Sequence, residues 1–496
     1  MGPLLLALIF GSLYLLYYII NFYRNVAKYP SGPLPLPLFG NLFSISKETL
    51  DKDIARLAKK YGSVFTIFIP IPVVVLSDYK SVKDAFVAKA DQFSARPKSM
   101  SNNEPTFCEN PGVILSNGDS WRENRRQAIS ILRDFGMGKG LMEEKVKLSI
   151  EEYLRCLHKI ENKEEVDMRW PIQLMVSNII NEILFGFRYK YDDCAYLIDY
   201  VETFNDLILS SSNSKLRILY MKYKWIKHVP ILGYYAVHKH NAKMLKLHSY
   251  IRDNVQRSLM GYNKGDEPEC YTQAYSNKIG TNPYITMEQL YATCHDFFLA
   301  GQETTTTTLR WAMLFLADNI DVQEKARAEL RFVVGSSRLP SMSDKPNMPY
   351  MSALVLELQR KANIVQASVF HATSEDTEIM GHRIPKGTLI DGDIHHILSN
   401  DPLFENPEVF RPERFLSEDG KTLKKELVDH AIAFSIGKRQ CAGEGLARVE
   451  LFLGLAATIQ HYRILPTELG PVNLEPIVTA IMMPPSVKVR LIPIAE

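Results

Sequence analysis

Apolar and polar positions along most of the chain repeat with a helical period. In residues 142–160 and 290–320, apolar side chains recur three and four positions apart, which is typical of helices with one buried face. Two short runs rich in β-branched residues, 64–69 and 73–77, predict strands of a small sheet instead. The chain is therefore predicted to be mainly α-helical with a small β region.

The chain begins with an apolar run that carries no charged side chain. Residues 2–23 are long enough to cross a bilayer as a helix, and Arg24 and Lys28 follow them. Because basic residues stay on the cytoplasmic side, we expect a transmembrane signal anchor over 1–23 with the rest of the chain in the cytosol. A cleaved signal peptide is the alternative, but the length of the run and the lack of a small-residue cleavage site argue against it.

Prolines recur through the segment that follows the anchor. Proline cannot continue a helix, and a run such as PSGPLPLPL favours an extended, stiff chain. Residues 24–42 are therefore predicted to be a basic, proline-rich hinge. Residues 43–496 show neither a repeat nor a second linker, so we expect them to form a single large helical domain.

Charge and cysteine usage exclude several classes of protein. The chain has 58 Lys and Arg against 56 Asp and Glu, a net charge of +2, so no charge excess points to nucleic acid. Its six cysteines are scattered and form no CxxC pair, which favours neither a disulfide framework nor a zinc site. This usage favours a reducing compartment.

One cysteine lies where a reactive thiolate is expected. Cys441 stands in the run FSIGKRQCAG (434–443), next to Lys438 and Arg439 and shortly before an apolar helical pattern. Positive charge and a helix N-terminus both stabilise an anion. Cys441 is therefore predicted to be a thiolate at the start of a helix.

The longest helical run contains residues that weaken a helix. Gly301 costs about 1 kcal/mol relative to alanine, and the threonines at 304–308 are poor helix formers. Ala300 and Thr304 share a face beside the glycine, so a flat ligand can lie there with Glu303 and Thr304 as an acid–alcohol pair above it. A bent helix whose threonines bond back to carbonyl oxygens is the alternative.

Two further pairs fall at helical spacing. Glu357 and Arg360 are three positions apart on an otherwise apolar helix, which predicts a buried ion pair with Arg414 as a second donor. Trp121 and Arg125 are four positions apart, so they can present an indole and a guanidinium to one carboxylate-bearing ligand.

A basic stripe lies on the same predicted helix as Trp121. Arg122, Arg126 and Arg133 fall close together on a helical wheel. A solvated helix face is one interpretation of this stripe, and docking of an acidic partner protein is the other.

These features occur together, in the order and at the distances found in one family. The chain resembles the cytochrome P-450 haem-thiolate monooxygenases, and in particular their microsomal, family-2-like branch. The resemblance runs from the anchor to the C-terminus, and the haem-loop motif alone is strongly specific. The matching motifs are FxxGxRxCxG (434–443), [AG]Gx[DE]T[TS] (300–305), ExxR (357–360), PERF (412–415) and WxxxR (121–125).

The resemblance implies the cytochrome P-450 fold and a haem b cofactor whose iron is bound by Cys441. Phe434 would pack beside the sulfur, and Gly437 and Gly443 would let backbone N–H groups approach it. The remaining implied haem contacts are Trp121, Arg125, Arg439 and His371 at the propionates, with Ala300 and Gly301 along the ring.

The resemblance also implies roles for the other motifs. Glu303 and Thr304 would be the catalytic residues that deliver protons during oxygen activation. The ion pair and its second donor would form a structural triad of Glu357, Arg360 and Arg414. The implied substrate-lining residues are Leu299, Val365, Val369, Ala480, Ile481, Phe107, Ile114, Leu207 and Ile208.

The activity implied in this way is insertion of one oxygen atom into a lipophilic small molecule, such as a xenobiotic, a fatty acid or a steroid. NADPH electrons would arrive through a cytochrome reductase, with a cytochrome b-type protein as a further donor, at the endoplasmic reticulum membrane. Two other classes stay open: a haem-thiolate isomerase or dehydratase acting on peroxides, and a non-enzymatic haem sensor or carrier. Glu303 and Thr304 argue against the isomerase, because its chemistry needs no proton relay.

The chain departs from the family pattern in two places. Gln366 and Phe370 stand where related proteins usually have prolines, in the strand implied to line the substrate site. Residues 391–401 are more acidic than is usual. His395 and His396 within them are adjacent and therefore point apart, which favours structural roles over a metal site.

Overall fold

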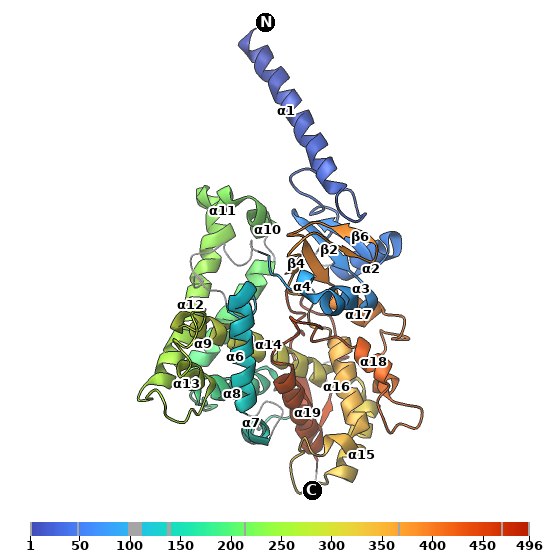
Figure 1. The fold of residues 1–496 in the computed structure, drawn as a ribbon. Helices are drawn as coiled ribbons and strands as arrows, with labels where there is room; N and C mark the ends of the chain where they lie inside the picture. The colour runs from blue at the N-terminus through green and yellow to red at the C-terminus, as the bar shows by residue number, and fades with distance from the viewer. Residues whose placement is uncertain are drawn as a thin grey trace.

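The computed structural model describes residues 2–46, 49–97, 112–135, 140–212, 215–365, 368–467 and 470–494. Its body is mainly helical with small sheets, as predicted (Figure 1). The helices are α1 (Pro3–Val26), α2 (Leu50–Tyr61), α3 (Tyr79–Lys83), α4 (Ala90–Phe93), α6 (Gly118–Asp134), α7 (Gly140–Lys159), α8 (Arg169–Phe185), α9 (Ala195–Ser212), α10 (Lys215–Lys222), α11 (Pro230–Gly233), α12 (Lys239–Leu259), α13 (Tyr271–Ser276), α14 (Met287–Asp318), α15 (Ile320–Val333), α16 (Pro349–Ala362), α17 (Ile394–Asn400), α18 (Lys425–His430) and α19 (Glu444–His461). The strands are β1 (Val64–Phe68), β2 (Pro72–Leu76), β3 (Val166–Asp167), β4 (His371–Ala372), β5 (Thr377–Ile379), β6 (His382–Ile384), β7 (Leu389–Gly392), β8 (Tyr462–Leu465) and β9 (Lys488–Pro493).

The largest sheet has four strands in the order β1-β2-β7-β4. β1 and β2 form an antiparallel pair, and β7 joins β2 in parallel. The two predicted strands are thus confirmed to within one residue at each end. Both faces of β1 are buried, since Phe65 packs with Ile54 and Leu57 of α2 while Val64 belongs to the cluster around Phe86 on the other side.

Helix α14 runs through the middle of the helical body (Figure 1). The hydroxyl of Thr286 accepts the backbone N–H of Gln289 and caps its first turn. Helices α8, α12, α16 and α19 pack around it. Gly301 packs against α8, where a Cβ at this position would lie 2.9 Å from Cδ1 of Ile180.

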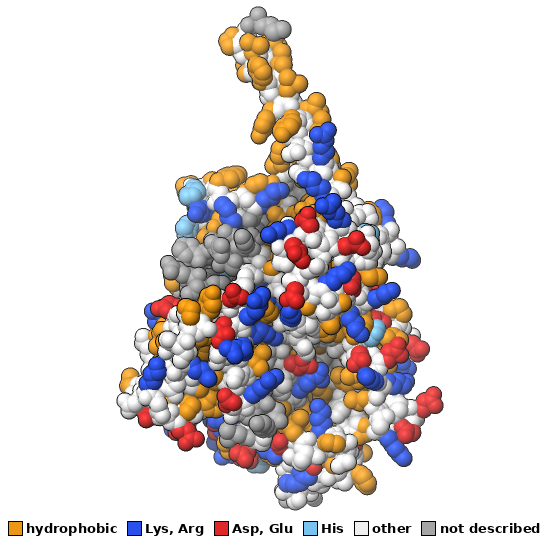
Figure 2. All heavy atoms as spheres, in the orientation of Figure 1, with side chains coloured by type: hydrophobic (Ala, Val, Ile, Leu, Met, Phe, Trp, Pro, Cys, Tyr) orange, Lys and Arg blue, Asp and Glu red, His pale blue; other side chains and the backbone are white. Residues whose placement is uncertain are grey.

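Helix α1 projects from the body at the end that carries the four-stranded sheet (Figure 1). It is 24 residues long, its apolar window has a mean hydropathy of 2.1, and none of that window is buried. Hydrophobic side chains cover it, and Lys and Arg side chains gather at its base (Figure 2). By length and composition it can cross a membrane, and a signal sequence near the N-terminus has the same properties.

The proline-rich segment packs on the body, whereas the sequence predicted a stiff connection between anchor and body. The carbonyl oxygen of Ser31 accepts the N–H of Thr66 at 3.2 Å. Asn41 donates its own N–H to the Phe68 carbonyl at 2.6 Å, and its Oδ1 accepts the Phe68 N–H at 2.8 Å. A chain in an extended conformation forms no backbone hydrogen bonds within itself. Here the backbone of residues 31–41 bonds to that of β1 instead.

Candidate active site

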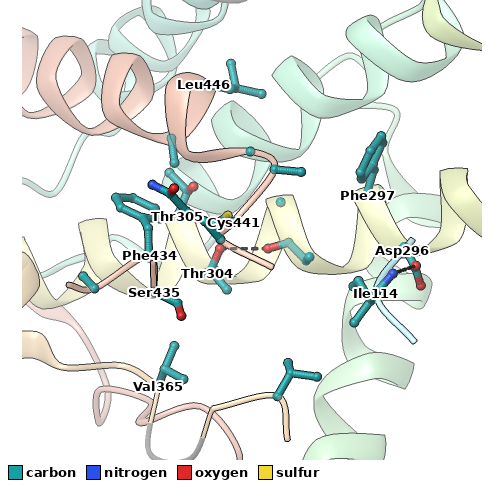
Figure 3. Close-up of a pocket in the computed structure, with 18 of the residues that line it drawn as sticks. Ile114, Asp296, Phe297, Thr304, Thr305, Val365, Phe434, Ser435, Cys441 and Leu446 are labelled. Carbon is teal, nitrogen blue, oxygen red and sulfur yellow. Dashed lines mark hydrogen bonds between the residues drawn. The ribbon is translucent and has the colours of Figure 1, made fainter. Parts of the chain in front are cut away.

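One cavity of about 340 Å³ lies between α14, the segment after α16 and the loop before α19. Phe434 and Cys441 border it from the loop, Thr304 and Thr305 from α14, and Val365 from the segment after α16 (Figure 3). Residues predicted from separate motifs are thus brought to one cavity.

Backbone contacts hold the loop that carries Cys441. The N–H of Cys441 donates to the carbonyl oxygen of Phe434 at 3.0 Å, which folds the loop back on itself. Gly437 has a φ of +84°, and a Cβ there would clash with the carbonyl oxygen of Phe86. Glycine is therefore required at 437 by its positive φ and by the nearby Phe86 carbonyl. That it also lets N–H groups approach the sulfur stays a prediction.

The sulfur of Cys441 borders the cavity at the start of α19. Burial raises the pKa of its thiol, while the backbone N–H groups of Gly443 and Glu444 and the charge of Arg125 lower it. Gly443 thus supplies an N–H group to the sulfur, as predicted. The side chain of Cys441 is nevertheless exposed at the cavity, where a bound group can reach the sulfur.

The basic side chains beside Cys441 in sequence have partners elsewhere, and the charge that lowers the pKa of its thiol is that of Arg125. Lys438 pairs with Asp91 at the surface. The guanidinium of Arg439 donates to backbone carbonyl oxygens, among them that of Ser94 at 2.8 Å. Neighbouring side chains in a loop leave the backbone in different directions, so nearness in sequence does not place their charges together.

Among the described residues, three guanidinium groups border the cavity: those of Arg96, Arg125 and Arg439, here called the cavity arginines. Arg96 and Arg439 are buried, and Arg125 is half-buried. Their hydrogen bonds run to backbone carbonyl oxygens, and no carboxylate among the described residues forms an ion pair with them. Burial lowers the pKa of all three, and neighbouring guanidinium charges lower those of Arg96 and Arg439 further. Buried cations without an acid form a binding site for an anionic group.

The other two predicted propionate ligands lie beside these arginines. The guanidinium carbon of Arg439 is 3.7 Å from the ring centroid of Trp121, and the indole N–H has no acceptor within the described chain. His371 borders the cavity with its Nδ1 2.8 Å from the carbonyl oxygen of Phe93. Burial lowers the pKa of His371 to about 3. An anion beside the ring would oppose that shift.

The α14 face of the cavity is shallow. Ala300, Gly301 and Thr304 all border the cavity. The hydroxyl of Thr304 donates to the carbonyl oxygen of Ala300 at 2.8 Å (Figure 3). This is the back-bonding of the alternative interpretation, and it occurs on a helix that also forms the cavity wall.

Glu303 lies on another side of α14 and does not border the cavity. It is fully buried, and the hydroxyl of Thr307 donates to its carboxylate at 3.2 Å. Burial raises the pKa of Glu303, while the charge of Arg310 and the Thr307 hydroxyl oppose this. The structure does not bring Glu303 and Thr304 together, because successive helix residues point about 100° apart.

In the described part of the chain, two other carboxyl groups border the cavity, and the sequence motifs indicated neither. Glu450 of α19 is buried near the Thr305 hydroxyl, and burial raises its pKa to about 8. Asp296 of α14 accepts the N–H of Ile114 at 2.8 Å, and burial raises its pKa to about 7. A lone glutamate in the apolar run 446–459 was a usable signal for the first, whereas no local pattern marks the second.

Glu357, Arg360 and Arg414 meet as the sequence predicts and are here called the buried triad. Nε of Arg360 lies 2.7 Å and Nε of Arg414 3.0 Å from Oε2 of Glu357, with all three side chains at most 2% exposed. The N–H of Arg411 donates to Oε1 of Glu357 at 2.9 Å. None of these residues borders the cavity. The Glu357 carboxylate thus lies away from the cavity, and donors within the protein surround it.

The predicted substrate-lining residues divide into two groups. Ile114, Val365 and Val369 border the cavity. Leu299, Leu207, Ile208, Ala480 and Ile481 do not, and Phe107 lies outside the described residues. Instead the apolar wall includes Ile180, Ile183 and Leu184 of α8, Phe297 of α14 and Leu446 of α19. Those helices are apolar on several faces, so sequence alone does not show which face meets a cavity.

The cavity fits haem. Haem brings an iron, a flat ring and two carboxylates, and the structure offers a cysteine sulfur, a shallow helix face and three arginines without an acid. The arginine side chains and the Cys441 thiol border the same cavity, so one haem could contact both. Cys441 would hold the iron, and Arg125 and Arg439 would bind the carboxylates together with Arg96, which the sequence analysis did not assign.

Comparison with known proteins agrees with this chemistry. A family model for cytochrome P450 matches residues 30–490. Cytochrome P450 2E1 of Bos taurus is 34% identical over 480 residues, which cover 94% of this chain and 93% of that protein. Cytochrome P450 2C21 of Canis lupus familiaris is 33% identical over 96% of this chain and 97% of its own length. Cytochrome P450 2H2 of Gallus gallus is 35% identical over 94% of each.

The chain belongs to the cytochrome P450 family. It is accordingly an oxidoreductase of the monooxygenase class, with haem iron as the cofactor that the family implies. The predicted fold and family are thereby confirmed.

Proposed function

We propose that this enzyme inserts one oxygen atom of O2 into a lipophilic small molecule, a xenobiotic, a fatty acid or a steroid. The second oxygen atom leaves as water, with two electrons from NADPH and two protons. The observation that supports this best is the cavity itself, in which Cys441 and the cavity arginines border the same space as Thr304 and an apolar wall.

The proposed roles follow from the contacts. Haem iron, when bound through a cysteine thiolate, supplies oxygen binding and O–O cleavage. Cys441 would ligate the iron with Phe434 beside it. Trp121, Arg125, Arg439 and His371 would bind the propionates, and Ala300 and Gly301 would leave room for the ring. The buried triad would hold the fold around the loop.

Thr304 is the proposed proton-delivering residue at the cavity. Its hydroxyl can exchange its bond to the Ala300 carbonyl for one to a water molecule inside the cavity. Glu303 stays the proposed proton source, and its buried, raised-pKa carboxyl group would have to turn from Thr307 to reach that water. Protons supplied in this way keep oxygen reduction coupled to substrate oxidation.

The proposed domain organisation is an anchor over residues 1–23, a connecting segment over 24–42 and the haem domain over 43–496. The apolar, exposed α1 and the basic residues that follow it support anchoring in the endoplasmic reticulum membrane with the haem domain in the cytosol. A single pass is proposed.

The proposed electron donors are an NADPH-dependent cytochrome reductase and, as a second source, a cytochrome b-type protein. Arg122 and Arg126 are exposed on α6, although each pairs with an acid of its own helix, Asp119 at 2.8 Å and Glu123 at 2.7 Å. An acidic partner would compete with these intrahelical pairs, which are weak at a surface. The stripe therefore remains the proposed docking surface.

The reduced carbon monoxide spectrum and NADPH turnover test this proposal together. We expect the purified full-length protein to show the strongly red-shifted Soret band of a thiolate-ligated haem and to lose it in Cys441→Ala. Cys156→Ala is the matched control, because Cys156 lies on α7 and does not border the cavity. Oxidised product must appear with reductase, NADPH and a lipophilic substrate panel. Peroxide rearrangement without reductase would establish the isomerase instead, and haem binding without any turnover would establish a sensor.

A further inference from the structure

The acidic stretch at 391–401 plays no part in the proposed function, yet it places a carboxylate behind the cavity wall. Asp391 lies in β7, where it is aligned with Val75 of β2, and it is only 8% exposed. A strand position inside a sheet with this burial normally takes an apolar side chain. The carboxylate must therefore have hydrogen-bond donors, and its donors identify what it does.

The donor to Asp391 is a residue of the cavity wall. Oγ of Ser368 donates to Oδ1 of Asp391 at 2.7 Å, and the backbone N–H of Ser368 bonds the same carboxylate. Ser368 borders the cavity beside Val365 and Val369. No cation of the described residues forms an ion pair with Asp391 or with its neighbour Asp393.

This bond fixes the polarity of the serine hydroxyl. A hydroxyl has one proton to donate, and here Asp391 takes it, so Ser368 can offer the cavity only the lone pairs of its oxygen. Burial raises the pKa of both aspartates. The two bonds from Ser368 favour the charged form of Asp391, and that charge raises the pKa of Asp393 further. The negative charge of the pair therefore lies on Asp391, behind the serine.

We propose that Ser368, backed by Asp391, binds a hydrogen-bond donor on the substrate: a hydroxyl or a protonated amine carried by a lipophilic body. The inference rests on the proposed function, in which this cavity holds the substrate. Two of the other polar groups that border the cavity are already bonded within the protein, Asp296 to Ile114 and Thr304 to its own helix. Ser368 is then a specificity-determining contact, and the neighbouring valines meet the apolar body.

Spectral titration of the purified full-length haem protein with two matched ligands tests this inference. The probes are 2-octanol and 2-octanone, which are similar in size and differ in having a donor. We expect wild type to bind the alcohol about fivefold to tenfold more tightly, since bonds backed by a charged group exceed neutral ones. Ser368→Ala should bring the ratio of the two dissociation constants close to one, whereas Ser368→Thr, which keeps the hydroxyl, should preserve the wild-type ratio.

Asp391→Asn reverses the expected preference. An asparagine amide can donate to the Ser368 oxygen, which frees the serine proton for the cavity and favours the ketone. Asp393→Asn is the matched control, because this acid caps α17 through the N–H of His396 and does not bond Ser368. A hindered tertiary alkylamine, protonated at neutral pH and too crowded to ligate iron, distinguishes the two donor classes. Tighter binding than the alcohol assigns an ammonium group, and weaker binding assigns a hydroxyl.

Equal alcohol-to-ketone ratios in wild type, Ser368→Ala and Asp391→Asn, each with an intact reduced carbon monoxide band, overturn the inference and leave the proposed function standing. If Asp391→Asn does not fold, the comparison of Ser368→Ala with Ser368→Thr decides the matter. A wild-type protein that neither responds to any probe nor oxidises substrate with NADPH contradicts the proposed function, and this inference with it.

Discussion

Two clusters of arginine side chains in this molecule differ in whether their charges are balanced by a carboxylate. In the buried triad, one carboxylate accepts bonds from two guanidinium groups and every partner is within the protein. The cavity arginines form no ion pair with a carboxylate of the described residues, and neighbouring guanidinium charges lower the pKa of Arg96 and Arg439. A saturated buried charge sustains a fold, whereas an uncompensated one destabilises it.

The difference shows which parts of the fold are complete before cofactor binding. The triad needs nothing from outside, so it can form while the chain folds. The cavity arginines reach the same state only when an anionic group binds, and that binding then stabilises the folded protein. We therefore expect the cavity arginines to depend on haem for their stability, and the buried triad not to.

Removing the triad's carboxylate should have the largest effect. Glu357→Ala leaves two buried guanidinium groups without an acid, which costs about 3–5 kcal/mol against a typical total stability of about 5–15 kcal/mol. We expect aggregated or haem-free protein, measured by soluble yield and haem content. Asp199→Ala is the control, since Asp199 pairs with exposed Lys246 and should change stability by under about 1 kcal/mol. If the Glu357→Ala variant folded and bound haem normally but turned over substrate slowly, the structural role of the triad would be contradicted.

Removing haem should increase the local mobility around the cavity arginines and leave the buried triad unchanged. Without the cofactor carboxylates, the cavity arginines repel one another, so hydrogen exchange should rise in residues 112–116, 368–372 and 434–443. Exchange within α16 should change little. Exchange mass spectrometry of the holo and apo proteins measures both. Uniform loosening of the two regions would show that the triad also depends on haem.

Removing one cavity arginine should weaken haem binding by the holo protein but leave the apo protein equally or more stable. Arg125→Met takes away a proposed propionate donor, so haem affinity should fall, by about tenfold or more for a lost charge-assisted bond. The same change relieves repulsion in the apo protein, which should therefore unfold at equal or higher denaturant concentration than wild type. Haem transfer to an acceptor protein and urea unfolding give the two values. A destabilised apo protein would mean that Arg125 serves the fold as the triad does.

The smallest effect on stability is expected at the opposite wall of the cavity. The Thr304 hydroxyl bonds only its own helix, so Thr304→Ala should leave haem content and unfolding close to wild type. NADPH consumption should persist while product falls and hydrogen peroxide rises, because proton delivery of this kind contributes on the order of 10²–10⁴-fold. Thr304→Ser is the control that keeps the hydroxyl. Unchanged coupling in the alanine variant would leave Thr304 as a helix residue alone.

Residues in compact motifs could be found from the sequence, because a motif fixes local geometry. Cys441 and the Glu357–Arg360 pair lie within one loop and one helix turn, and the structure places both as expected. Glu303 was adjacent to Thr304 in the motif, but helix rotation separates the two side chains. Motifs therefore identify elements more reliably than they identify which side chain faces a cavity.

The residues that the sequence did not assign act through distant contacts. Arg96 joins the cavity arginines only because β4 and the start of α6 lie next to it in the fold. Asp296 became visible as a cavity group through its bond to Ile114, 182 positions away. Asp391 was recognised as unusual, yet its partner Ser368 lies on another segment. Each of these roles depends on contacts between segments that are far apart in the chain, and a single sequence does not reveal such contacts.

The covering of β1 by residues 31–41 has a consequence for making a soluble form of this enzyme. β1 is an edge strand, and the backbone groups of Thr66 and Phe68 on its outer side are bonded by Ser31 and Asn41. A truncation after residue 23 keeps that cover. A truncation after residue 42 would expose a ready template for strand pairing between molecules, and such edges promote aggregation. The position of the cut, rather than loss of the membrane helix, would then decide between a monodisperse preparation and a precipitate.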